Sequence, residues 1–382
     1  MKNILHISHT DINHDNRILK EINSISKLPN SNVFGLGIKL NENTVEQKIE
    51  KENIEIITLN LFTKKLIFFP KTIRHPLIFL ELFFRSIFCL VRTKPSIIHC
   101  HDTLVLPIGV FYKIFNRKTY LIYDAHELES KRNGQSKISS YFTLLIEKIS
   151  WSKNDLLISV SDSIINWYNK NLGLKKSLLI MNAPLINENK IINKQKNYFR
   201  MKYQIPEKSK VFLYVGLFSK GRSIEKILNV FSKESIKSHV VFIGFGNLEK
   251  LIKEYESVNN NIHFHPPIRH DKLVSFIKYA DFGLCLIENI SLSDYFCLPN
   301  KLFEYTFAGI PIIGSNFPEI KRIIKKHNIG VTCSVRDENS IKSKIKELEN
   351  HNYNFKFSNL SKLSWEQQEK KLNIIYKKII NR

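Results

Sequence analysis

Cysteine is scarce in this chain, and so are glycine, proline and long apolar runs. Five cysteines, an odd number with no C-x-x-C pair, argue against a disulfide framework or a zinc site and are typical of a reducing cytosol. Thirteen glycines and twelve prolines in 382 residues exclude a collagen-like or low-complexity chain. The segment Met1–Ile7 enters a strand pattern directly, without the features of a signal peptide.

Acidic residues are also in short supply. The chain has 35 aspartates and glutamates against 58 lysines and arginines, for a net charge of +23. A field of this sign attracts nucleic acid, acidic lipid headgroups or phosphorylated substrates. A compositional bias explains many lysines but not their excess over acidic residues, so we interpret the charge as a functional surface. The lysines are spread along the whole chain and no nucleic-acid-binding motif is present, which disfavours that partner.

The remaining composition is globular, and the length predicts two domains. Apolar runs alternate with amphipathic segments, as in parallel sheets covered by helices. Strands are expected at residues 3–8, 33–37, 54–59, 96–101, 120–126, 155–161 and 178–184, and after a polar linker, Asn187–Lys196, at 211–216, 240–244, 261–264, 282–286 and 309–315. We predict an α/β fold of two Rossmann-like domains facing a cleft, 1–186 and 187–365. The C-terminal helix (Ser364–Ile380) crosses back, so that residues 366–382 pack on the first domain.

The most informative segment is Leu298–Tyr305, followed by Ala308–Ser315. It has the pattern of a tight loop, a helix with one glutamate, and a buried strand. A loop entering a helix N-terminus offers free backbone N–H groups and the positive end of the helix dipole, which together bind phosphate. Glu304, one turn into the helix, is placed to accept hydrogen bonds from sugar hydroxyls. The segment indicates either a sugar-nucleotide diphosphate site or an ordinary loop–helix–strand unit.

Polar residues follow the other predicted strands, where open α/β sheets bind their ligands. Many of these polar residues belong to seven short motifs, which are distributed over nearly the whole chain. The motifs are Asp15–Glu21, His99–Asp102, Tyr123–Leu128, Asn182–Pro184, Tyr214–Arg222, Pro299–Ser315 and Trp365–Gln368. In this order and spacing the chain resembles the family 4 glycosyltransferases of GT-B fold, the glycosyl transferases group 1, and among them those that build bacterial surface polysaccharides. The resemblance implies transfer of a sugar, with retention of configuration, from a nucleotide-diphosphate sugar. It implies no obligatory metal and no cofactor. We predict a lipid-linked glycan as the acceptor.

The resemblance also implies a donor site in the second domain. The residues expected to bind the donor are Gly216, Lys220, Arg222, Gly244, Leu298, Asn300, Lys301 and Glu304. Arg222 neutralises the diphosphate, because without Mg²⁺ the charge of the leaving group needs basic side chains and helix N–H groups. Glu304 binds the nucleotide ribose. Pro299 has no N–H group, so its two neighbours supply any backbone donors in that loop.

One position departs from the family pattern. The family has a second glutamate eight positions before Glu304, where this chain has Phe296. The contact with the donor sugar must then come from Asp294, Asn300 or Lys301. The loop therefore indicates the class of donor but neither its sugar nor its nucleobase.

The first domain contributes the remaining expected site residues. The resemblance places His126 beside the donor sugar, where an imidazole binds a hydroxyl or carries positive charge near the leaving phosphate; a structural histidine is the alternative. The expected catalytic residues are His126, Arg222 and Glu304, and the expected acceptor-side residues are Asp15, Arg17, His101 and Asp102. Arg17 is equally able to pair with Glu21 one helical turn on. The implied mechanism is front-face displacement without a protein nucleophile.

A basic and aromatic segment lies between Leu61 and Lys94. Seven basic residues and seven phenylalanines accompany a single acidic residue, Glu81. Pro76, Glu81 and Arg85 interrupt the apolar run, which falls short of the about 20 residues that a spanning helix needs. Such a segment suits an interface with anionic lipid, although a buried helix with a solvated basic flank is the alternative. We predict a cytoplasmic protein, peripheral on the inner face of the plasma membrane.

Three other functions fit parts of the pattern. A sugar-nucleotide 2-epimerase of GT-B fold would convert the donor without an acceptor, and the basic and aromatic acceptor-side surface argues for transfer instead. A non-catalytic protein that binds membrane or nucleic acid would explain the charge alone. A dinucleotide-binding dehydrogenase is disfavoured, because the segment Gly244–Gly246 lacks the third glycine of that fingerprint.

Overall fold

The computed structural model describes residues 1–39, 53–185, 198–350 and 357–381. It divides into two compact units, one of residues 1–180 and 368–382 and one of residues 181–367. The predicted linker, Asn187–Lys196, and the predicted boundary after residue 186 lie outside the described residues.

The first unit is a parallel sheet covered by helices. Its strands are β1 (Lys2–Ile7), β2 (Ser31–Ile38), β3 (Ile54–Leu59), β4 (Ile97–His101), β5 (Tyr120–Ala125), β6 (Leu156–Ser159) and β7 (Ser177–Leu179). Its helices are η1 (Ile12–His14), α1 (Asn16–Ser26), η2 (Phe62–Lys65), α2 (Lys71–Thr93), η3 (Thr103–Val105), α3 (Leu106–Phe115), η4 (Glu129–Lys131), α4 (Lys137–Trp151) and α5 (Asp162–Leu172). The strand order, over the part of the chain that is described, is β3-β2-β1-β4-β5-β6-β7.

The second unit repeats this plan. Its strands are β8 (Val211–Leu217), β9 (His239–Phe245), β10 (Ile262–His265), β11 (Phe282–Cys285), β12 (Ile312–Ser315) and β13 (Gly330–Cys333). Its helices are α6 (Tyr198–Lys202), α7 (Ile224–Phe231), α8 (Glu249–Val258), α9 (His270–Ile277), α10 (Leu292–Tyr295), α11 (Asn300–Ala308), α12 (Pro318–His327), α13 (Glu338–Glu349) and η6 (Phe357–Leu363). The parallel strands follow the order β10-β9-β8-β11-β12-β13.

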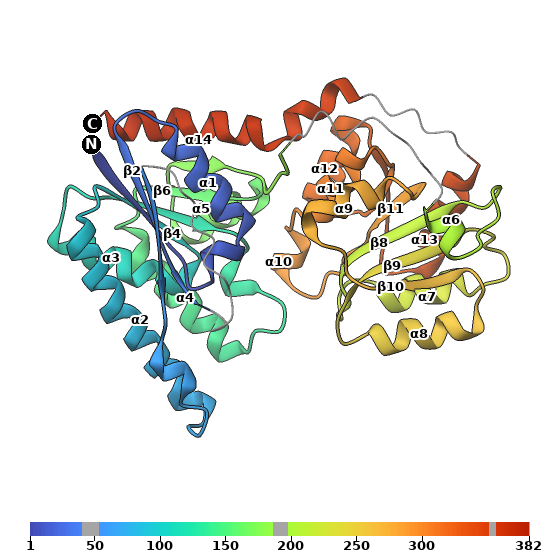
Figure 1. Cartoon of the computed structure of the whole chain (residues 1–382), viewed down its shortest axis with the longest axis horizontal. Coiled ribbons are helices and arrows are strands. Elements are labelled where there is room, and N and C mark those ends of the chain that lie inside the picture. The colour runs from blue at the N-terminus through green and yellow to red at the C-terminus, as the bar shows by residue number, and fades with distance from the viewer. Residues whose placement is uncertain (40–52, 186–197, 351–356, 382) are drawn as a thin grey trace. The chain divides into compact units, whose positions relative to one another are not determined.

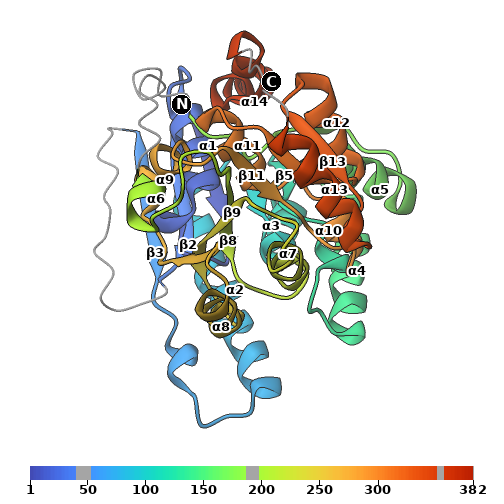
Figure 2. The same cartoon turned by 90° about the vertical axis from the view of Figure 1, so that its right-hand side faces the viewer.

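The sheets are buried because helices cover both of their faces. In the first unit α1 lies on one face, and α2, α3 and α4 lie on the other (Figure 1). In the second unit α7 and α8 lie on one face, and α9, α11 and α12 on the other (Figure 2). Every residue of β4, β6, β11 and β12 is buried, as expected of parallel strands enclosed in this way. The predicted pair of Rossmann-like halves is confirmed.

The C-terminal helix α14 (Trp365–Ile380) returns to the first unit, as predicted. The hydroxyl of Tyr376 lies 2.8 Å from Nδ1 of His99 on β4, and both side chains are fully buried. Glu369 forms an ion pair of 2.7 Å with Lys27 at the end of α1. The last helix is therefore part of the core of the first unit (Figure 1).

One local feature differs from the sequence-based expectation. The edge strand β13 was not predicted, because its sequence, Gly-Val-Thr-Cys, has no run of large apolar residues. Pro76, which interrupts the predicted apolar run, lies inside α2 and is exposed. Within the described ranges, no helix combines the length and the apolar character needed to cross a membrane.

Candidate functional site

The second unit brings two glycines into contact at the ends of β8 and β9. Gly216 and Gly244 have φ angles of 131° and 153°, in a region that other residues rarely adopt. A Cβ atom on Gly244 would lie 1.9 Å from the carbonyl oxygen of Gly216. Gly244 is therefore required by the close approach of the two backbones, and Gly216 by its positive φ angle.

Lys301, in the first turn of α11, projects over this glycine pair. Its Nζ atom lies 3.8 Å from the centre of the Tyr214 ring and would be 3.7 Å from a Cβ atom on Gly216. The ammonium is shielded from solvent and has no hydrogen-bond partner among the described residues. A buried cation without such a partner is costly. The Lys301 ammonium is therefore available to bind an anion at the end of β8.

Arg222 lies in the turn between β8 and α7. Its Nη1 atom is 3.4 Å from Oδ1 of Asp294, and a third of the side chain is exposed. A single long contact of this kind leaves other guanidinium N–H groups able to bind a ligand. Lys220, in the same turn, is exposed.

The segment from Leu298 onwards has the predicted loop–helix form. Pro299 precedes α11 and no side chain caps the helix, so its first N–H groups have no side-chain partner. Leu298 is buried and Asn300 is exposed. Glu304 is 8% exposed. The Tyr305 hydroxyl accepts a hydrogen bond from the Val215 N–H at 2.9 Å, which fixes α11 against β8.

Phe296 ends α10 and is half-buried. Of the three residues named to replace the missing glutamate, Asp294 faces Arg222 and Lys301 faces Tyr214, whereas Asn300 is exposed. The second unit thus collects two basic side chains, two glycines and the start of α11 in one region.

In the first unit a buried ion pair joins α1 to the end of β5. The guanidinium of Arg17 makes two parallel hydrogen bonds to Asp124, at 2.9 and 3.1 Å, and a third to the Ile180 carbonyl oxygen at 2.8 Å. Its Nε atom is 3.3 Å from Glu21. Burial acts to lower the pKa of Arg17, but these carboxylates raise it. Only 3% of Arg17 is exposed, so it acts within the protein rather than at the acceptor surface proposed for it.

His126 lies between two carboxylates at the edge of this network. Its Nε2 atom is 3.2 Å from Asp124 and its Nδ1 atom is 3.6 Å from Asp102. Burial works to lower the pKa of His126, but Asp102 and Asp124 outweigh it and raise that pKa to about 10. The imidazole is therefore positively charged at neutral pH and is 19% exposed.

Asp102 has a strained backbone. Its φ and ψ angles of 69° and 166° are in a region almost reserved for glycine. Its N–H group donates to the Asp124 carbonyl oxygen at 3.0 Å, and this bond helps to hold the loop after β4 in place. The strain places the Asp102 carboxylate beside the exposed edge of His126.

Beneath His126 lies a column of buried imidazoles. Nδ1 of His101 is 3.1 Å from Nε2 of His126, and Nε2 of His101 is 2.9 Å from Nδ1 of His6. The rings of His99 and His101 stack at 4.4 Å. Burial lowers the pKa of His99 to about 3 and that of His101 to about 4, so both are neutral. His101 therefore supports His126 from below, with no exposed surface of its own.

Sequence reasoning missed three inner members of this network: His6, His99 and Asp124. It gave Glu21 as a possible partner of Arg17, and the contact of 3.3 Å confirms that pair. A signal was present, because His99 and His101 are two residues apart on one strand and so point to one face. The pairing of β1 with β4 then brings His6 opposite His99. Asp15, predicted on the acceptor side, caps α1 by accepting hydrogen bonds from the N–H groups of Arg17 and Ile18.

Comparison with known proteins agrees with this arrangement. Residues 195–362 match the family model described as "Glycosyl transferases group 1". An uncharacterized glycosyltransferase of Methanocaldococcus jannaschii is 24% identical over 295 residues, covering 71% of each chain. The chitobiosyldiphosphodolichol beta-mannosyltransferase of Candida albicans is 22% identical over 276 residues, covering 66% of this chain and 58% of that one.

Solved structures share the fold. Sucrose-phosphate synthase from Thermosynechococcus elongatus superposes with a TM-score of 0.76 at 14% identity, over the full length of both chains. Anabaena HepE in complex with UDP superposes with a TM-score of 0.67 at 11% identity, also over both full chains. The protein is therefore a glycosyltransferase of the GT-B fold, and residues 195–362 of its second unit match the glycosyl transferases group 1 family.

Proposed function

We propose that this enzyme is a retaining family 4 glycosyltransferase. It moves a sugar from a nucleotide-diphosphate sugar to a lipid-linked glycan acceptor in the biosynthesis of a cell-surface polysaccharide. The main support for donor binding is the ammonium of Lys301. It is buried beside Gly216 and has no hydrogen-bond partner among the described residues. The name of the Candida albicans relative, which specifies a dolichol-diphosphate-linked acceptor, supports the acceptor class.

The donor binds through its diphosphate and its ribose. Lys301 and Arg222 neutralise the diphosphate, and the uncapped N-terminus of α11 adds N–H groups and a positive dipole end. Glu304 accepts hydrogen bonds from the ribose hydroxyls. Two basic side chains and a helix terminus take the place that Mg²⁺ has in other nucleotide-sugar sites, so transfer requires no metal at the diphosphate.

Transfer proceeds on one face of the donor sugar. The bond between the anomeric carbon and the phosphate oxygen breaks, the bond to the acceptor oxygen forms on the same face, and the acceptor proton passes to the departing phosphate. His126 supplies positive charge near the sugar, and Asp102 orients it. Arg17 and His101 act through Asp124 and His126 as positioning residues.

Binding of nucleotide-diphosphate sugars should raise the melting temperature of the protein. A UDP-, GDP- or dTDP-sugar at 100 times its dissociation constant stabilises the folded state by about 2.7 kcal/mol. CMP-sugars are the matched control, because they carry a single phosphate and cannot engage both basic residues. A thermal-shift series that shows no response to any diphosphate sugar contradicts the proposal. Conversion of a donor to its epimer in the absence of acceptor would favour the epimerase.

The segment formed by η2 and α2 (Phe62–Thr93) supports contact with a membrane. Its exposed side chains include Phe62, Ile67, Phe68, Phe84 and Phe88, each at least 66% exposed. Glu81, the acidic residue of the segment, accepts hydrogen bonds from the backbone of Phe62 and Thr63, which ties η2 to α2. An apolar tip surrounded by basic side chains suits the headgroup region of an anionic leaflet.

The double variant Ile67→Ser/Phe68→Ser should bind anionic vesicles more weakly, by about tenfold or more, because each apolar side chain contributes roughly 1.5 kcal/mol or more on burial. Sedimentation with phosphatidylglycerol-containing vesicles measures the effect. Leu174→Ser is the control, since Leu174 is 92% exposed elsewhere in the same unit. Equal binding of vesicles by the wild type and the double variant would show that this segment does not contact the membrane.

A further inference from the structure

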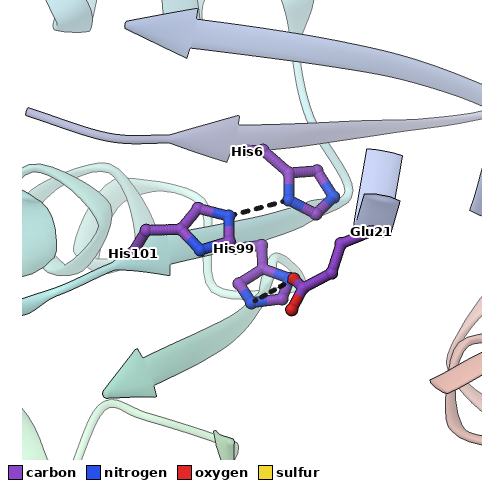
Figure 3. Close-up of side chains that lie close together, drawn as sticks. All are labelled: His6, Glu21, His99 and His101. Carbon is purple, nitrogen blue, oxygen red and sulfur yellow. Dashed lines mark hydrogen bonds and ion pairs between the residues drawn. The ribbon is translucent and has the colours of Figure 1, made fainter. Parts of the chain in front are cut away.

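Four buried side chains of the first unit converge beneath Asp124. His6 comes from β1, Glu21 from α1, and His99 and His101 from β4 (Figure 3). All four are fully buried, and each offers one ligand atom such that the four atoms lie within 4.8 Å of one another. Three neutral imidazoles and the carboxyl group of Glu21, whose pKa burial raises to about 8, thus lie close together.

The hydrogen bonding of this cluster is incomplete. Among the described residues, neither carboxyl oxygen of Glu21 accepts a hydrogen bond, and Nε2 of His99 has no hydrogen-bond partner. Glu21 has longer contacts with Nε of Arg17 at 3.3 Å and with Nε2 of His99 at 3.6 Å, and the same His99 atom lies 3.6 Å from Asp124. Buried polar atoms almost always have a hydrogen-bond partner, so these three atoms point to a ligand between them.

We propose that His6, Glu21, His99 and His101 bind one divalent transition-metal ion, with Zn²⁺ as the best match. Three imidazole nitrogens and a carboxylate oxygen form a complete tetrahedral donor set for a structural ion. Bonds of about 2.0–2.1 Å place tetrahedral ligand atoms roughly 3.4 Å apart. The contacts of 2.9 Å between His6 and His101 and of 3.6 Å between His99 and Glu21 bracket that spacing.

The surroundings of the cluster suit a metal. His99 contacts the Tyr376 hydroxyl through Nδ1 at 2.8 Å, which leaves Nε2 for the ion. Nδ1 of His101 lies 3.5 Å from Asp124, in the arrangement by which carboxylates orient metal-binding histidines. Arg17 is close to Glu21, but its charge is balanced by its paired hydrogen bonds to Asp124. Burial holds the imidazoles in the neutral form that binds metals.

The ion would join β1, β4 and α1 and, through Tyr376, α14. It lies beneath Asp124 and His126 rather than at the donor diphosphate, so it is a structural ion and leaves transfer metal-independent. The scarcity of cysteine that argued against a zinc site in the sequence does not apply to it, because its ligands are histidines and a glutamate.

The test is elemental analysis of the full-length protein, purified without chelator after expression with added zinc. We expect one zinc ion per chain and, after exchange, the intense visible spectrum of tetrahedral Co²⁺. Glu21→Gln keeps the shape of the side chain and should weaken metal binding by about 100-fold or more. His239→Gln is the matched control, since His239 contacts His263 at 3.0 Å in the second unit without a carboxylate.

Zinc-edge X-ray absorption of the wild type decides the case if Glu21→Gln does not fold. Nitrogen and oxygen neighbours at about 2.0–2.1 Å, with imidazole scattering, support the site. Sulfur neighbours would assign the metal to cysteines and overturn it. A folded wild type that neither contains nor takes up a transition metal overturns it as well. None of these results depends on the proposed donor or acceptor.

Discussion

Lys301→Met is expected to weaken binding of the nucleotide-diphosphate donor by about 10- to 100-fold, the contribution of one charge-assisted contact. The loss in transfer rate should be larger, about 10²–10³-fold, because negative charge on the diphosphate grows as the glycosidic bond breaks. Methionine retains most of the packing against Tyr214, so the fold should remain intact. Calorimetric titration with the donor identified by thermal shift measures the first effect, and transfer to a glycan acceptor measures the second.

A surface lysine provides the comparison. Lys250→Met removes the same charge from α8, where the side chain is 91% exposed, and should leave donor binding within about twofold. Arg222→Ala should weaken donor binding and slow transfer to a similar degree as Lys301→Met, because both cations are proposed to neutralise the same diphosphate. If Lys301→Met bound the donor as tightly as Lys250→Met, the ammonium beside Gly216 would have no part in donor binding.

Asp124→Leu is expected to destabilise the first unit by about 3–5 kcal/mol, because it leaves the buried guanidinium of Arg17 without its main partner. Chemical denaturation followed by circular dichroism measures the loss. The double variant Arg17→Met/Asp124→Leu should recover much of it, since a buried ion pair replaced by apolar side chains is often near neutral. The recovery distinguishes an uncompensated charge from a simple loss of packing.

A weak ion pair serves as the reference for this cycle. Glu254→Ala breaks the contact of 3.9 Å with Lys250, in which both side chains are exposed, and should cost about 0.5 kcal/mol or less. A double variant that is as unstable as Asp124→Leu would show that removing the unpaired Arg17 charge restores no stability, and would contradict an uncompensated charge as the cause of the loss. The hydrogen bonds of Asp124 to His126 and of Arg17 to Ile180 would then account for the stability.

The order of strands and helices could be read from the chain because it depends on short periodic patterns. The strand predicted at 54–59 coincides with β3, and those at 120–126 and 211–216 end within one residue of β5 and β8. The same short patterns show where each strand ends, and the polar residues just after those ends include Asp102, His126 and Arg222. In contrast, β13 depends on the neighbouring strand β12, which supplies the pairing that its own sequence does not indicate.

Some features of the site were determined by the sequence alone. The loop before Glu304 and the basic turn at Arg222 are local, because each needs only a few consecutive residues to form. The glycines at 216 and 244 are visible in the sequence, but the close approach that requires Gly244 is made between two strands of the folded sheet. The tertiary structure decided which side chains meet. Arg17 contacts Asp124 across 107 residues, and His99 contacts Tyr376 across 277.

Burial then decided what those side chains do. Arg17 has its expected charge, but because it is enclosed it supports the site instead of contacting a substrate. His99 and His101 are neutral, whereas His126, two residues along from Asp124 and between two carboxylates, is charged. Residue type sets the possible chemistry of each group, but its charge depends on desolvation and on partners that only the folded chain brings within a few ångströms.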